Sequence, residues 1–332
     1  MKHDHDGTEK YDVDQMQDVP QTHMAAEQEG LKRDLRLRHM IMIAVSGTIG
    51  TGLFLTSGGT IATAGPGGAL LAYCLIGLWL VFVCQAIGEI ATLLPLPGAF
   101  NAWGARVFDE AFSFQMTWMY FINWALTIPA ELAAAAVIVE FWLPEGSTFP
   151  SWVVPLIIIL IMVAINVTGV KAYGEIEYWL SVLKVFTIIM FIVCGLKSWS
   201  HRDAPFVGGF LAFVKVLVSV GYAYGGSEMT GVTAAESRNP HKHVPKAVNT
   251  VLIRIAGFYI SSVFLLGAIV KYDDPRLINT TKSAAKAPFT VVFLEAGISA
   301  AANYMNAVVF TSIFSAINSD FYVATRMLLS LS

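Results

Sequence analysis

Two charged side chains stand inside long apolar stretches of the sequence. Lys184 lies in the middle of the apolar run 179–189, and Glu228 follows the glycine pair Gly225–Gly226. An ionisable group at the centre of a bilayer costs at least about 2.5–3.5 kcal/mol, so it usually faces a cavity or a partner. We interpret Lys184 as a candidate for proton exchange and Glu228 as a functional candidate. The alternatives are a structural lysine that contacts backbone carbonyls and a glutamate at a cytoplasmic helix end.

Glycines in the segment 46–52, Ser-Gly-Thr-Ile-Gly-Thr-Gly, indicate a binding site of another kind. Each glycine inside a helix costs roughly 1 kcal/mol relative to alanine, so this spacing predicts an unwound turn. Amide N–H groups freed there, at the positive end of the next half-helix, suit a carboxylate. Carbonyls freed from the preceding half-helix accept hydrogen bonds from an ammonium group. The segment is therefore expected to bind both ends of a zwitterion.

A second break is predicted within 221–231, where Tyr222 and Tyr224 precede the glycine pair and Glu228. Either tyrosine could instead be an ordinary packing residue. Glu89 and Glu131 are further acids within apolar stretches, and we expect them to form structural pairs rather than to contact substrate.

The elements that must position these residues are membrane-spanning helices. Of the 332 residues, 55% are hydrophobic and 14% are charged, and the mean hydropathy is +0.61, too apolar for an ordinary soluble domain. A helix needs roughly 20 apolar residues to cross the hydrocarbon core. Eight spans are predicted at about 39–62, 68–94, 111–143, 152–169, 175–197, 208–236, 247–270 and 289–325.

The two glycine-rich segments fall in the first and sixth spans, five spans apart. A repeat of five spans has inverted topology in its second copy, and paired interrupted helices of this kind mark the binding site of secondary transporters. We expect a first repeat at about 39–197 and an incomplete second repeat at about 208–332. The alternative is that the glycines only permit close helix packing.

The first 30 residues are acidic and poor in aliphatic side chains, which predicts a disordered tail, with a transmembrane domain from 31 to 332. With the N-terminus inside, the cytoplasmic loops hold eleven Lys and Arg residues against six outside. This bias predicts that both termini are cytoplasmic.

The net charge of −3 does not suggest nucleic acid, and Cys74, Cys84 and Cys194 match neither a metal site nor a disulfide framework.

Several motifs together resemble amino-acid permeases of the amino acid-polyamine-organocation (APC) superfamily, in the group typical of bacteria and fungi. The similarity runs from about residue 31 to the end of the sequence. The motifs are Gly47–Phe54, Gly88-Glu89, Pro97–Phe100, Tyr224–Glu228, Glu236, Asn239-Pro240, Pro245–Val248, Asn318-Ser319 and Arg326–Leu328.

The resemblance implies an all-α integral membrane protein with a LeuT-type fold and discontinuous first and sixth helices. About eight of an expected twelve transmembrane helices are present. It also implies a plasma-membrane symporter of amino acids and protons without a cofactor or metal. The substrate-binding residues that it implies are Ser46, Ile49, Gly50, Thr51, Gly52, Tyr224, Gly225 and Ser227, and the proton-coupling residues are Lys184 and Glu228.

The sequence departs from the family in its length and at Asp320, where a small residue is usual. We expect a truncated permease, and Asp320 is either a coupling site or a residue at a break in the eighth span. The alternatives are an inactive paralogue, one that needs association with another permease chain, or a carrier of polyamines or other organic cations. An enzyme is disfavoured, because the aqueous segments show no nucleophile-base set, metal cluster or phosphate loop.

Overall fold

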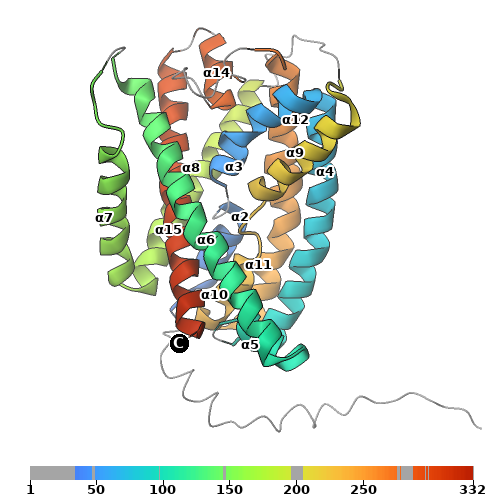
Figure 1. Ribbon diagram of the computed structural model, residues 1–332, viewed down its shortest axis with the longest axis vertical. Helices are drawn as coiled ribbons and strands as arrows, with labels where there is room; N and C mark the ends of the chain where they lie inside the picture. The colour runs from blue at the N-terminus through green and yellow to red at the C-terminus, as the bar shows by residue number, and fades with distance from the viewer. Residues whose placement is uncertain are drawn as a thin grey trace, which may run out of the picture.

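The computed structural model describes residues 34–46, 49–96, 98–144, 147–195, 205–274, 277, 287–295, 297 and 299–331 (Figure 1). Within these ranges the regular elements are helices, and one isolated bridge joins Leu35 to Ser237. The predicted all-α class is confirmed. The predicted disordered tail, 1–30, lies outside the described residues.

The first predicted span is divided among three helices. They are α2 (Leu37–Ser46), α3 (Thr51–Phe54) and the start of α4 (Thr56–Leu93). Gly65, with a φ of 77°, and the following Pro66 kink α4 at the boundary predicted between the first and second spans. A positive φ suits glycine, and proline lacks the N–H that would continue the helix.

The third, fourth and fifth predicted spans correspond to long or strongly apolar helices. Asp109 caps the helix of the third span by accepting a hydrogen bond from Phe112 N at 2.6 Å. The elements are α5 (Phe100–Val107), α6 (Glu110–Val139), the 3₁₀ turn η2 (Glu140–Trp142), α7 (Val153–Val167) and α8 (Val170–Gly195).

The sixth span is interrupted, as predicted. Helix α9 (Gly209–Ala223) ends before the irregular segment 224–228, and α10 (Met229–Thr233) and the 3₁₀ turn η3 (Ala234–Glu236) follow. Gly226 has a φ of 84°, a conformation that a side chain would disfavour, so the glycine pair permits the break.

The seventh span is continuous through α11 (Pro240–Arg254), the π-helical segment η4 (Ile255–Ile260) and α12 (Ser261–Ile269). The predicted eighth span, 289–325, is wrong at its start, because α14 (Pro288–Glu295) and α15 (Ser299–Leu331) are separate helices. Gly297, with a φ of 71°, lies in the turn between them. A residue in the left-handed conformation ends a helix, and the apolar character from which the span was predicted does not reveal that conformation.

Among the described residues, five helical segments are long and apolar enough to cross a membrane. They are Thr56–Leu93, Glu110–Trp142, Val170–Gly195, Pro240–Ile269 and Ser299–Leu331. Helices α7 and α9 are apolar but have 15 residues each. The count of eight spans, the LeuT-type repeat and its boundaries therefore stay predictions.

The interrupted helices lie inside the bundle. Figure 1 shows α2 and α3 near its centre, with α6 and α15 crossing beside them. Helix α15 packs along α6, α4 packs on α9, and α2 packs on α8 and α11. Helix α7 lies at the periphery, and its exposed aliphatic side chains include Ile157, Leu160 and Val163. Such a surface is suited to lipid.

Helices α3 and α9 approach each other at Gly52. A Cβ atom on Gly52 would lie 2.5 Å from the Cα atom of Ala223 and 3.0 Å from its carbonyl oxygen. Because these are backbone atoms, a side chain could be accommodated only by moving a helix. Glycine at position 52 therefore permits the contact that brings the two breaks together.

At the C-terminal end of α15, an ion pair joins three segments. Arg326 Nε donates to Glu236 Oε1 at 2.6 Å, and the hydroxyl of Tyr322 donates to Glu236 Oε2 at 2.5 Å. The backbone of Glu236 accepts a hydrogen bond from Leu35 N at 3.1 Å. Glu236 is 1% exposed, so its charge depends on these partners.

Gly52→Ala tests the contact between α3 and α9. We expect it to destabilise the protein by about 1–3 kcal/mol, because the added methyl group overpacks two backbones. The matched control is Gly59→Ala, since a Cβ atom there has no neighbour within 4 Å. It should change stability by at most about 1 kcal/mol, in the stabilising direction. Thermal unfolding in detergent measures both, and equal behaviour of the two variants would contradict the close approach.

Arg326→Ala tests the ion pair. It leaves the buried carboxylate of Glu236 without its guanidinium, and we expect a loss of about 2–4 kcal/mol in stability. The control is Arg238→Ala, because Arg238 lies 3.5 Å from Asp34 in a pair whose side chains are 49% and 37% exposed. An exposed pair contributes about 0–1 kcal/mol. If the two variants unfold at the same temperature, the ion pair between Arg326 and Glu236 stabilises the protein no more than an exposed pair does.

Candidate functional site

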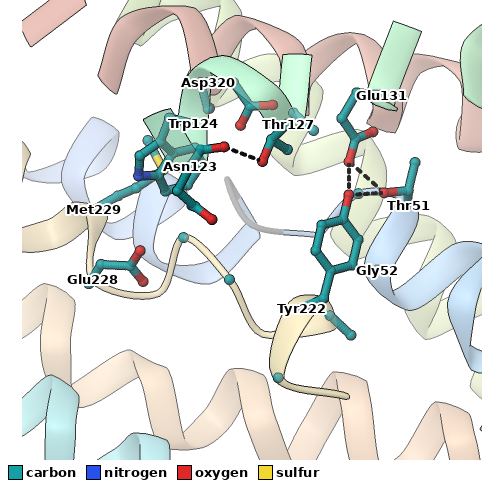
Figure 2. A pocket seen from close by; sticks show the side chains of 17 residues that line it. Thr51, Gly52, Asn123, Trp124, Thr127, Glu131, Tyr222, Glu228, Met229 and Asp320 are labelled. Carbon is teal, nitrogen blue, oxygen red and sulfur yellow. Dashed lines mark hydrogen bonds between the residues drawn. The ribbon is translucent and has the colours of Figure 1, made fainter. Parts of the chain in front are cut away.

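A cavity of about 340 Å³ lies where the two helix breaks face each other, between α6 and α15 (Figure 2). Its volume is at the lower end of the range for small-molecule sites. The described residues that line it are Gly50, Thr51, Gly52, Asn123, Trp124, Thr127, Glu131, Gly221, Tyr222, Ala223, Gly225, Gly226, Glu228, Met229, Ala316, Ser319 and Asp320.

Four of the predicted substrate-binding residues line this cavity: Gly50, Thr51, Gly52 and Gly225. Ser46 is the last residue of α2, and Gly47 and Thr48 lie outside the described residues. Ile49 is fully buried in the apolar core. Backbone from both breaks thus lines one cavity, whereas Ile49 packs in the apolar core and does not line it.

Tyr224 and Ser227, also predicted to bind substrate, contact other parts of the protein. The hydroxyl of Tyr224 donates to Tyr73 O at 3.2 Å, and its ring stacks on Tyr259 with centroids 4.5 Å apart. Ser227 Oγ donates to Tyr224 O at 2.6 Å. Tyr222, two residues before Tyr224, is the tyrosine of this segment that lines the cavity.

Glu228, predicted to couple protons, does line the cavity, at the residue before α10. The hydroxyl of Tyr120 on α6 donates to Glu228 Oε1 at 3.0 Å. A carboxylate held in this way beside a cavity can accept and release a proton without leaving its position.

Glu131 has a larger place in the cavity than its sequence predicted. Its Oε1 accepts hydrogen bonds from Thr51 Oγ1 at 2.5 Å and from the hydroxyl of Tyr222 at 3.1 Å (Figure 2). Thr51 belongs to α3 and Tyr222 to α9. The carboxylate from α6 therefore connects the two half-helices that lie on one side of the breaks.

Lys184 is completely buried in α8, and its partners are on α8 and α15. Its Nζ donates to Ser315 Oγ at 2.8 Å and lies 3.9 Å from Glu177 Oε1. Ser315 Oγ in turn donates to Glu177 at 2.5 Å. Sequence reasoning missed Glu177, although a spacing of seven residues, about two helical turns, places it on the same face of the helix as Lys184.

Arg254 was also misread. It is one of the eleven Lys and Arg residues assigned above to the cytoplasmic loops, but its side chain is completely buried in α11. Its Nη1 donates to Ala44 O at 2.8 Å, and its Nη2 donates to Ser227 Oγ at 2.5 Å. The arginine thus joins the end of α2 to the break before α10. Its position inside the predicted span 247–270 was the signal that should have removed it from the loop count.

Asp320 on α15 lines the cavity and is 3% exposed. Its Oδ2 atom has no hydrogen-bond partner among the residues that the structure describes. The cavity wall therefore carries three carboxyl groups, from Glu131, Glu228 and Asp320. In the described part of the chain, no cluster of three or more His, Cys, Asp or Glu residues is arranged to hold a metal ion.

Comparisons with known proteins show which family the chain resembles. The family model described as "Amino acid permease" matches residues 39–332. Histidine permease HisP of Lactococcus lactis subsp. cremoris is 46% identical over 319 residues, which cover 92% of this chain and 66% of the relative.

Two lysine-specific permeases named LysP are also similar. That of the same Lactococcus strain is 45% identical over 91% of this chain and 63% of the relative. That of Escherichia coli is 41% identical over 92% of this chain and 65% of the relative. The chain therefore spans slightly less than two thirds of the length of these curated relatives. With a family model that matches most of its residues, the chain belongs to the amino acid permease family.

Proposed function

We propose that this chain forms the substrate-binding part of a secondary transporter that carries amino acids across the cell membrane together with protons. The observation that carries the proposal is the cavity at two interrupted helices, whose wall combines backbone of Gly50–Gly52 and Gly225–Gly226 with three carboxyl groups. Discontinuous helices that face one another inside a membrane are typical of transporter binding sites. The relatives named for histidine and lysine support amino acids as the substrate class.

The polar backbone at the breaks suits the common part of every amino acid. Amide groups at the start of α3 are oriented to bind a carboxylate, because the first N–H groups of a helix lack partners within it. Carbonyls of the broken helices accept hydrogen bonds from the α-ammonium group. These contacts do not depend on the side chain, so they define a zwitterion without selecting one amino acid.

Proton coupling is supported by two buried groups in different places. Glu228 is at the cavity wall, where it contacts Tyr120, and Lys184 is in the bundle, where it contacts Ser315 and Glu177. Glu228 is positioned to exchange a proton with the cavity. Lys184 is positioned to transmit a change of charge to α15 through Ser315. We propose these roles because each group is desolvated and each has a polar partner on a neighbouring helix.

We further propose that both termini are cytoplasmic. Removing Arg254 from the count leaves ten loop cations on the cytoplasmic side against six outside, so the bias keeps its direction.

Uptake into proteoliposomes that contain the purified chain tests the transport mechanism. A labelled amino-acid mixture should accumulate when an inward proton gradient is imposed. Lys184→Ala and Glu228→Gln should each reduce gradient-driven uptake by about tenfold or more, which corresponds to a transport barrier that is higher by roughly 1.4 kcal/mol.

The matched control for the lysine is Lys215→Ala, because Lys215 is exposed on α9 and outside the cavity. The control for the glutamate is Glu110→Gln, because Glu110 is exposed in the first turn of α6. Both should keep the uptake of the unmodified chain. Uptake that is the same with and without the gradient would exclude proton symport, and uptake of spermidine in preference to amino acids would identify a polyamine carrier.

A further inference from the structure

Asp320 contributes a buried carboxyl group to the cavity wall, and one of its oxygens has no donor in the described part of the chain. Its side chain is 3% exposed and lines the cavity, and its Oδ2 atom has no partner among the described residues. A buried carboxylate without a donor is unfavourable, because it has lost its hydration and gained no hydrogen bond. The energetic deficit at Asp320 is removed when a donor enters the cavity.

The two other acids of the cavity each accept hydrogen bonds at one oxygen, and Glu131 Oε2 is, like Asp320 Oδ2, without a partner among the described residues. Two hydroxyl groups, from Thr51 and Tyr222, donate to Glu131, and the hydroxyl of Tyr120 donates to Glu228. Figure 2 shows Asp320 apart from the cluster formed by Glu131, Tyr222 and Thr51. Asp320 is therefore a separate acidic position on the wall.

The cations buried nearby are hydrogen-bonded to other groups, although the charge of Lys184 also attracts Asp320. Lys184 is bound to Ser315 and Glu177, and Arg254 is bound to Ala44 and Ser227. Of the described residues that line the cavity, none is basic. A positive charge opposite Asp320 within the cavity must then come from what binds there.

We propose that Asp320 pairs with a cationic side chain of the substrate, so that the cavity selects amino acids that carry an ammonium, guanidinium or imidazolium group. This inference rests on the proposed function, since it adds a side-chain contact to the zwitterion site. The helix breaks contribute backbone contacts to the α-groups, and α15 contributes a charged contact to the far end of the ligand.

Charge complementarity gives the direction of the preference. An acidic side chain would bring a fourth carboxyl group to a desolvated wall that already holds three and has no basic residue among its described lining, so its charge would be uncompensated and would oppose binding. A neutral side chain would leave Asp320 buried and unpaired. A cationic side chain removes both penalties and forms a charge-assisted hydrogen bond.

Competition binding to the purified chain in lipid nanodiscs tests the proposal. Labelled L-lysine is displaced by unlabelled L-lysine, by L-norleucine, which has the same four-carbon side chain without the ammonium, or by L-glutamate. In the unmodified chain we expect lysine to bind about tenfold or more tighter than norleucine, and glutamate to bind weakest. In Asp320→Asn the lysine affinity should fall to about that of norleucine, whose own affinity should change by less than about threefold.

Two variants keep the result interpretable. Asp320→Glu retains the charge and should retain a preference for lysine over norleucine. Asp109→Asn removes an exposed carboxylate at the cap of α6 while keeping a capping residue, and it should bind like the unmodified chain. Thermal unfolding of each variant shows whether it is folded before binding is compared.

The outcomes separate this inference from the proposed function. If norleucine binds the unmodified chain as tightly as lysine, the side-chain inference is wrong and the amino-acid site remains. If Asp320→Asn weakens lysine and norleucine equally, Asp320 does not recognise the side chain, as would hold for a carboxyl group that only carries a proton. If the folded, unmodified chain binds no amino acid, the proposed function itself fails.

Discussion

A backbone that leaves its helix inside a membrane has no water to bind, and the rest of this structure depends on how the protein meets that constraint. The carbonyls at the end of α2 are freed by the first break, and Arg254 donates to one of them, Ala44 O. The same guanidinium binds Ser227 at the second break. Because one side chain binds both breaks, the two breaks are held face to face. The cavity follows from that arrangement.

Buried charge is distributed according to whether it has a fixed partner. Lys184 and Glu177 are both completely buried, and Ser315 lies between them, so this part of the bundle is internally compensated. The cavity wall differs, since Glu131 and Glu228 accept hydrogen bonds from neutral hydroxyl groups, and Glu131 Oε2 and Asp320 Oδ2 have no partner among the described residues. Hydroxyl donors stabilise a carboxylate but do not neutralise its charge. At α8 a lysine offsets the charge of a glutamate, whereas the described residues that line the cavity include no base, so the cavity is suited to a cation or a proton.

The sequence predicted the breaks because the glycine effect is local: the segments 46–52 and 224–228 are poor helices whatever surrounds them. Partners were harder to predict, because they depend on which helix faces meet. Tyr222 and Tyr224 are separated by about 200° on a helix, so one can face the cavity while the other packs behind it, and composition does not say which. The hydrogen bonds of Glu131 exist because α3 and α9 lie beside α6, and the sequence pattern does not show which helices are neighbours.

The hydrogen bonds around the cavity hold the half-helices as two pairs. Glu131 binds Thr51 on α3 and Tyr222 on α9, which lie on one side of the breaks. Arg254 binds Ala44 on α2 and Ser227 at the entry to α10, which lie on the other side. Alternating access needs each side of a fixed site to open in turn, and it is achieved largely by rigid-body motion. Under the transport function proposed above, two separate ties with unwound backbone between them would let one pair tilt while the other keeps its contacts. A ligand in the cavity would contact both pairs, for example at Thr51 of α3 and Met229 of α10, so its binding would be sensitive to their relative position.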